Sequence, residues 1–271
     1  MTNFIRIFIL IIFLKLGAPN AHAHELWLDS KEFQPPEVGN IEIELRNGQN
    51  FSGLNLPYFN KSVKQFFWVQ NGKRHKVRSR LGDIPAMSTS IESEGLVLVV
   101  YESTPEIITY DQWEEFTDFI KNKDFPDAKK LHLARGLPKK GFKEFYYRYS
   151  KALIGLGHSK GSDSNFGLET EFVAQTNPYV DKPEADFTAK LLYQQLPRKN
   201  TQVEVFERDP KNHVRVFMLR TDEFGSVSVP IKPGFDYLLD AVVLREATPQ
   251  TSNGAVWESL WANITFSVPS K

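Results

Sequence analysis

Short stretches with strand character recur along most of this 271-residue chain, and they constrain its fold more than any other feature. In residues 41–45, apolar side chains alternate with charged ones, which is the period-two pattern of a strand with one wet face. Residues 66–70 and 74–78 flank Asn71-Gly72, a sequence that favours a hairpin turn. The apolar run at residues 95–101 indicates a strand that is buried on both faces. These patterns predict a mainly β fold.

The middle of the chain has a different pattern. Trp113, Phe116, Phe119 and Ile120 recur at helical spacing, and Asp111 is placed to cap a helix there. Residues 127–135 and 143–151 are predicted as two further short helices. The polar, Gly- and Ser-rich residues 159–165 are predicted as a flexible linker.

Strand patterns return after this linker, at a spacing typical of a β-sandwich. They cover residues 168–173, 186–193, 201–206, 214–219, 225–229, 237–244 and 261–268. We therefore predict a signal peptide at residues 1–23, an N-terminal β module at 24–110, a helical insertion or connector at 111–158, and a C-terminal β-sandwich at 159–271.

The first residues have the features of a secretory signal peptide. Arg6 precedes an apolar run that Lys15 interrupts, well short of the roughly 20 residues a membrane-spanning helix needs. The run ends at Ala21-His22-Ala23, an Ala-x-Ala site, which predicts cleavage before His24. The alternative is an uncleaved anchor. We expect export to the periplasm, with no membrane insertion after cleavage.

Composition excludes several classes of function. The chain has no cysteine, which excludes disulfides, thiolate metal sites and a cysteine nucleophile. Removal of residues 1–23 leaves 31 basic residues against 33 acidic ones, which gives no support for nucleic-acid binding. Glycine-rich phosphate loops, nucleophile elbows and His-Glu-x-x-His helices are absent from the sequence. We expect a non-enzymatic protein, although a hydrolase built only from long-range contacts would leave no such motif.

A histidine at the new N-terminus has a specific chemical property. The α-amine and the ring Nδ1 of His24 form a six-membered chelate with a divalent metal. Because an α-amine has a pKa near 7.7–8.0, its deprotonation costs little at neutral pH. Imidazole suits copper, nickel and zinc. Two donors are not a complete site, and a histidine left there by chance of cleavage is the alternative.

Motifs spread over the chain resemble those of the NikM-like periplasmic proteins, a family of unknown function named after a component of nickel and cobalt uptake transporters. They are His24-Glu25-Leu26-Trp27-Leu28, Tyr101-Glu102-Ser103, Arg148-Tyr149-Ser150-Lys151-Ala152-Leu153, Thr176-Asn177-Pro178-Tyr179, Val203-Glu204-Val205-Phe206, Thr221-Asp222 with Gly225, and Trp257-Glu258-Ser259-Leu260-Trp261-Ala262. The resemblance implies two β-sandwich modules of the immunoglobulin or transthyretin type, the second of them transthyretin-like, and export to the periplasm.

The resemblance also bears on metal ligands. Relatives tend to carry a terminal histidine, Gly-His in an early loop and Val-His in the penultimate strand. This chain has His24, but Gln49 and Val243 stand at the other two positions. The glutamine at position 49 is a poor metal ligand, and the side chain of Val243 cannot bind a metal at all. His75 is a substitute ligand if the fold brings it close, and Glu258 is expected either to be structural or to accept a hydrogen bond from His24.

Two classes of function follow. The first is a periplasmic accessory protein that binds nickel, cobalt or copper and delivers it to a membrane transporter or an outer-membrane receptor. The second is a metal-free β-sandwich module that binds a ligand or another protein. A copper redox enzyme with a terminal histidine brace is a third possibility, but it would require a second histidine opposite the first.

Overall fold

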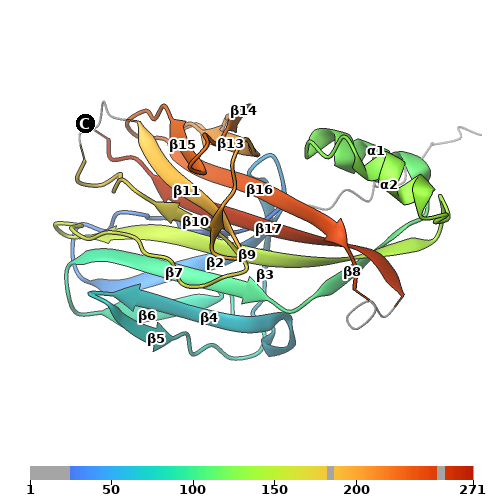
Figure 1. Ribbon diagram of the computed structural model, residues 1–271. Helices are drawn as coiled ribbons and strands as arrows, with labels where there is room; N and C mark the ends of the chain where they lie inside the picture. The colour runs from blue at the N-terminus through green and yellow to red at the C-terminus, as the bar shows by residue number, and fades with distance from the viewer. Residues whose placement is uncertain (1–24, 182–185, 249–253, 271) are drawn as a thin grey trace, which may run out of the picture.

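The computed structural model describes residues 25–181, 186–248 and 254–270. The predicted signal peptide and His24 lie outside these residues. A nine-stranded sheet forms the centre of the protein (Figure 1). Its strands are, in order, β14 (Val214–Arg220), β13 (Gln202–Arg208), β16 (Asp236–Glu246), β17 (Ala255–Ser267), β9 (Phe142–Leu156), β7 (Gly95–Ser103), β4 (Val63–Gln70) and β5 (Lys73–Lys76), and β8 (Glu106–Tyr110) pairs with β9.

Two smaller sheets pack on opposite faces of the central sheet. One contains β10 (Thr170–Ala174), β11 (Phe187–Tyr193), β12 (Leu196–Pro197) and β15 (Ser226–Val229). The other contains β1 (Glu25–Asp29), β2 (Gly39–Gln49), β3 (Ser52–Leu56) and β6 (Met87–Ile91), and a short 3-10 helix, η1 (Asn60–Ser62), follows β3. The prediction of a mainly β protein with sandwich modules is confirmed, and the two sandwiches share their middle sheet.

The strand β7 shows why the central sheet is so apolar. Leu96, Leu98 and Val100 pack into the cluster shared with β10 and β11, while Val97 and Val99 pack into the cluster shared with β2. A strand covered on both faces needs apolar residues at every position. The predicted doubly buried strand is therefore confirmed.

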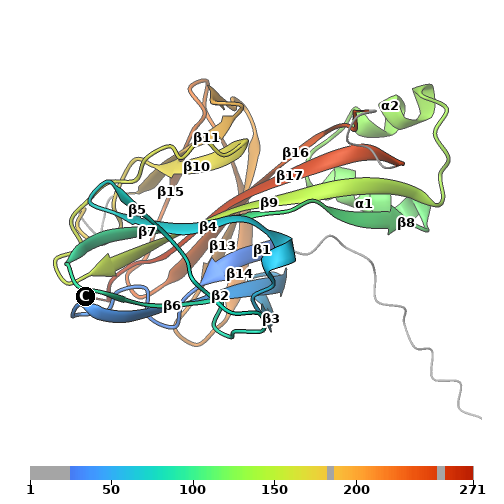
Figure 2. The same ribbon diagram turned by 90° about the horizontal axis from the view of Figure 1, so that it is seen from below.

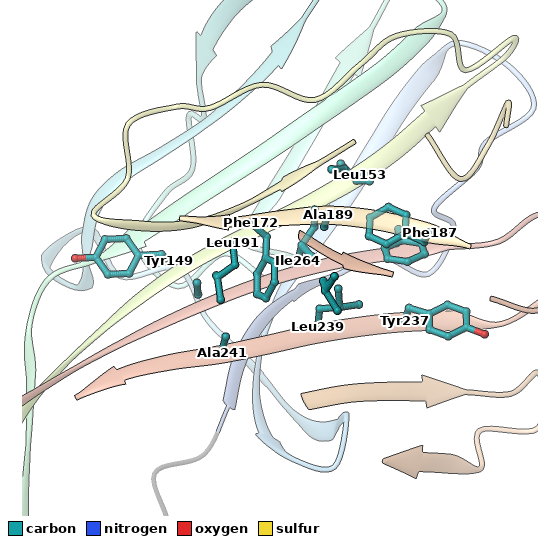
Figure 3. Packing of buried hydrophobic residues seen from close by; sticks show 14 of the residues in the cluster. Tyr149, Leu153, Phe172, Phe187, Ala189, Leu191, Tyr237, Leu239, Ala241 and Ile264 are labelled. Atoms are coloured by element: carbon teal, nitrogen blue, oxygen red, sulfur yellow. The ribbon is translucent and has the colours of Figure 1, made fainter. Parts of the chain in front are cut away.

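The core of the C-terminal sandwich is rich in rings and branched side chains (Figure 3). Phe187 on β11 stacks on Phe266 of β17, with ring centroids 4.0 Å apart. Leu239 and Ile264 are fully buried beside them. Because this chain has no disulfide, such packing is what holds the sandwich together.

The two helices occupy one end of the molecule. Strands β9, β16 and β17 extend beyond the sandwich as an arm, and α1 (Trp113–Asn122) and α2 (Ala128–Ala134) lie on this arm (Figure 2). Phe116 packs on Trp257 and Phe119 on Trp261, with centroids 5.9 Å apart in each pair. The two helices confirm the predicted helical insertion. Neither is long and apolar enough to cross a membrane, and no other described segment forms a helix that is.

Three local predictions are wrong. Residues 143–151, predicted as a helix, belong to β9, where aromatic side chains suit a strand held between two neighbours. Gln112, not Asp111, is the N-cap of α1, and it forms no side-chain cap bond. Residues 159–165 are anchored rather than free, because the buried Asp163 accepts hydrogen bonds from Lys151 of β9.

All three domains predicted after the signal peptide contribute strands to the central sheet. Residues 24–110 supply β4, β5, β7 and β8, residues 111–158 supply β9, and residues 159–271 supply the remaining four strands. The parallel pairing of β9 with β17 joins the two halves at the middle of the sheet.

Candidate functional site

The first described strand is fixed by side chains of the central sheet. Asn263 of β17 donates to the Leu26 carbonyl at 2.6 Å, and Thr265 donates to the Leu28 carbonyl at 2.7 Å. Arg208 of β13 binds both carboxylate oxygens of Asp29 at 3.1 Å. These bonds satisfy the strand edge that β2 does not cover, and they hold Glu25 in a defined place.

Glu25 lines a cleft of about 210 Å³ between α1 and the strands β1, β2, β13 and β14, which we call the α1 cleft. The cleft is lined by Glu25, Gln49, Asn50, Tyr110, Glu115, Phe119, Asn122, Lys123, Glu204, Phe206, Val216 and Met218. Its charged side chains are three glutamates and one lysine, and its apolar wall includes the half-exposed Met218.

The centre of this site is the ammonium group of Lys123, at the end of α1. Its Nζ lies 3.3 Å from Glu25 Oε1, 2.8 Å from Glu204 Oε2 and 3.4 Å from Asp240 Oδ2. The three carboxylates come from β1, β13 and β16, and the lysine side chain is only 9% exposed. One cation thus joins the helical insertion to two of the three sheets.

Three carboxylates share this single ammonium, and the pKa values of Lys123, Asp240 and Glu204 reflect it. Burial alone would lower the pKa of Lys123, but Asp240, Glu204 and Glu25 raise it above its usual range. Burial raises the pKa of Asp240 to about 7, because the attraction of Lys123 is opposed by the neighbouring carboxylates. Burial also raises the pKa of Glu204, against the attraction of Lys123. The site therefore carries one carboxyl group, that of Asp240, whose pKa lies near neutrality.

A further buried carboxyl group, that of Glu144, lies in the arm. Tyr110 donates a hydrogen bond to Glu144 at 2.9 Å, and Ser259 donates one to the other carboxylate oxygen. Burial raises the pKa of Glu144 to about 7, although both hydrogen bonds oppose this. Arg148 packs its guanidinium 4.3 Å from the centroid of the Trp261 ring. Glu144 and Arg148 are enclosed, so they support the cleft rather than line it.

The structure brings one of the sequence-predicted residues to the α1 cleft. Gln49 ends β2, and because Glu25 pairs with Gly48, the two side chains line the same cleft. His24 lies outside the described residues, one peptide bond before Glu25. Val243 is on β16 and packs into the main core.

The other two predicted residues lie elsewhere. His75 is on β5, at the far edge of the central sheet, where its ring stacks on Trp68 with centroids 4.0 Å apart. Glu258 accepts a hydrogen bond from Arg245 Nε at 2.7 Å. It lies on the face of β17 that carries Leu260, whereas Asn263, which contacts β1, lies on the other face.

Lys123, Glu204 and Asp240 were not predicted from the sequence. Two of them leave a weak signal, because Glu204 and Asp240 each interrupt an apolar strand in which a charge is costly unless it has a partner. Lys123 leaves none, since it follows an ordinary amphipathic helix. Only the topology brings residues 25, 123, 204 and 240 together.

The donor set of the cleft bears directly on metal binding. Within residues 25–181, 186–248 and 254–270, no group of three or more histidine, aspartate or glutamate side chains is arranged to hold a metal ion. The three carboxylates that converge in the α1 cleft instead surround the ammonium of Lys123.

Comparison with known families gives one match. The sequence profile of a domain of unknown function, DUF4198, matches residues 21–245. The chain belongs to this family. The DUF4198 match includes β1, both helices and most of β16, and so it covers every element that forms the α1 cleft.

Beyond this DUF4198 match, no curated protein matches the chain. One similar solved structure is described as a tetra-tandem repeat in the extending region of a large adhesion protein. It is 12% identical, with a TM-score of 0.21, and the alignment covers 90% of this chain and 49% of that one. This chain thus spans about half the length of that structure, and the low TM-score carries no argument about fold or function.

Proposed function

We propose that this DUF4198 protein is an exported, non-enzymatic accessory protein of transition-metal uptake, which binds nickel, cobalt or copper through His24 after signal cleavage. The proposal rests on the resemblance to NikM-like proteins and on the position of Glu25. Consecutive Cα atoms are about 3.8 Å apart, so His24 is directly joined to a residue that lines the α1 cleft. The partner would be a membrane transporter or an outer-membrane receptor in the periplasm.

The charge of the α1 cleft supports cation binding. Glu25, Glu115 and Glu204 line it against the single cation Lys123, and such an excess of acid raises the local concentration of divalent ions. The amide oxygen of Gln49 is available as a weak further donor. The exposed thioether of Met218 adds a soft donor, which favours copper over nickel and cobalt.

One observation favours a second candidate, a metal-free interaction module. Lys123 already neutralises part of the acidic cluster, so the cleft is a stable arrangement without an added cation. In that case the cleft would receive a ligand or a loop of another protein.

Calorimetric titration of the protein that begins at His24, with Ni²⁺, Co²⁺, Cu²⁺ and Zn²⁺, tests the proposal. The matched control carries one extra alanine before His24, which removes the α-amine from the chelate and leaves the fold unchanged. We expect submicromolar binding that the extra residue abolishes. Absent binding, or equal binding by both forms, would reject the metal proposal in favour of the interaction module.

A further inference from the structure

The charges of this chain are unevenly distributed, although they balance overall. Between Glu44 and Asp83, the 38 residues from 45 to 82 contain eight lysines and arginines and no aspartate or glutamate. They form the end of β2, β3, β4 and β5 with their loops. Since β5 is the last strand of the central sheet, the β4–β5 part of this segment lies at the edge opposite β14 (Figure 1), whereas the end of β2 lies beside the α1 cleft.

Several of these basic groups face solvent without an acidic neighbour. Lys73, Lys76 and Arg78 are exposed, and within the described part of the chain none of them forms an ion pair. By contrast, Lys64 binds Glu102 at 2.7 Å, and Arg80 lies 3.5 Å from Asp83. Most of the positive charge at this edge is therefore available to an anionic partner.

Large apolar side chains are exposed in the loops that precede β4 and follow β5. Phe59, Leu81 and Ile84 are 48%, 69% and 56% exposed. They come from two loops that are joined by backbone hydrogen bonds, from Tyr58 to Asp83 and from Gly82 to Tyr58, each 2.9 Å long. The two bonds hold the two loops side by side, and we call the three exposed side chains that these loops carry the apolar tip.

From this combination we infer that the apolar tip and the basic edge strand form a docking surface for a bilayer that contains anionic phospholipid. Exposed apolar side chains enter the interface between headgroups and acyl chains, while neighbouring lysines and arginines attract the anionic headgroups. A nucleic-acid partner would use the charges, but it would give no role to three solvated apolar side chains, whereas a bilayer with anionic headgroups fits both features. Docked in this way, the protein would hold the α1 cleft away from the membrane surface.

Flotation of the full protein with vesicles tests this inference. We expect it to bind vesicles containing phosphatidylglycerol, to bind pure phosphatidylcholine vesicles weakly, and to bind less tightly as salt is raised to 0.15 M. Lys73→Gln combined with Lys76→Gln and Arg78→Gln should lower the affinity about 100-fold, from the usual contribution per basic residue. Leu81→Ser should also lower binding, because it removes an apolar anchor.

Matched variants separate this surface from general charge and hydrophobicity. Lys129→Gln combined with Lys130→Gln and Lys140→Gln removes three exposed charges near α2, and Leu196→Ser removes a leucine with the same 69% exposure as Leu81. Both controls should bind vesicles like the unmodified protein. Absence of binding to anionic vesicles at low salt would overturn the inference. Equal losses in the test and control variants would overturn it too.

Discussion

The Nζ atom of Lys123 lies 2.8 Å from Oε2 of Glu204, although 81 residues separate the two in the sequence. With Glu25 and Asp240 beside it, this contact fastens the end of α1 to β1, β13 and β16. The cluster is thus both the interior of the α1 cleft and the attachment point of the helical insertion.

Replacing Lys123 with methionine should destabilise the fold strongly. The change leaves three buried carboxylates without their cation, and breaking a buried ion pair in this way costs about 3–5 kcal/mol. Because the orphaned carboxyls then hold protons more tightly in the folded than in the unfolded state, the loss should be larger at pH 8 than at pH 5. Urea denaturation at both pH values measures this. Lys121→Met, at an exposed position in the last turn of α1, is the control and should change stability by less than about 0.5 kcal/mol. A small, pH-independent effect of Lys123→Met would contradict the prediction.

Replacing Glu144 with glutamine should flatten the dependence of stability on pH. Burial raises the pKa of Glu144 from 4.5 to about 7, so the folded protein keeps a proton that the unfolded chain releases. The resulting cost is absent below about pH 4.5, grows up to about pH 7, and then stays near 3 kcal/mol. The free energy of unfolding, measured from pH 4 to pH 8, should therefore fall less steeply in Glu144→Gln. Glu114→Gln, at an exposed site, should keep the original slope. If both variants have the same slope, Glu144 is ionised in the folded protein at lower pH than this structure indicates.

Replacing Phe187 with alanine should open a cavity between β11 and β17. Phe187 is 1% exposed and stacks on Phe266, and truncation of such a ring usually costs about 3–5 kcal/mol. Phe224→Ala provides the comparison, because that side chain is 64% exposed and should contribute little. Chemical denaturation of the two variants checks the difference. Similar losses in both would show that the shared core does not dominate stability.

Replacing Gln49 with histidine should strengthen metal binding by the protein that begins at His24. The substitution supplies an imidazole in the α1 cleft, beside Glu25, where the present side chain is a poor ligand. We expect at least a tenfold decrease in Kd for Ni²⁺ or Cu²⁺ in a calorimetric titration. His75→Gln, at the far edge of the central sheet, should leave that Kd unchanged. An unaltered Kd for Gln49→His would place the metal donors elsewhere.

The sequence predicted those elements whose pattern is local. The apolar run of β7 and the Asn-Gly hairpin between β4 and β5 depend on neighbouring residues only, and both are as expected. The end of the predicted insertion was harder to predict from the sequence. Its residues belong to β9, in which aromatic and charged side chains follow no single periodic pattern. Its strand conformation is imposed by β7 and β17 on either side.

The candidate site was less predictable than the fold. The family resemblance singled out positions 24 and 49, and the β1–β2 register places Gln49 beside Glu25, the residue that follows His24. Lys123 could not be found in this way, because its role depends on carboxylates from three strands that only the complete sheet assembles. An isolated acid within an apolar strand, such as Asp240, is the pattern that merits attention in similar chains.

The parallel pairing of β9 with β17 also governs when the protein can fold. β17 begins at Ala255, more than a hundred residues after its partner, and it separates β9 from β16 in the central sheet. A ribosome delivers β17 after every other described strand of this sheet, so the sheet that both sandwiches share cannot close until residues 255–267 have been made. Pairings between such distant segments are slow to form. The chain therefore remains open during synthesis for longer than a protein whose modules fold one after another.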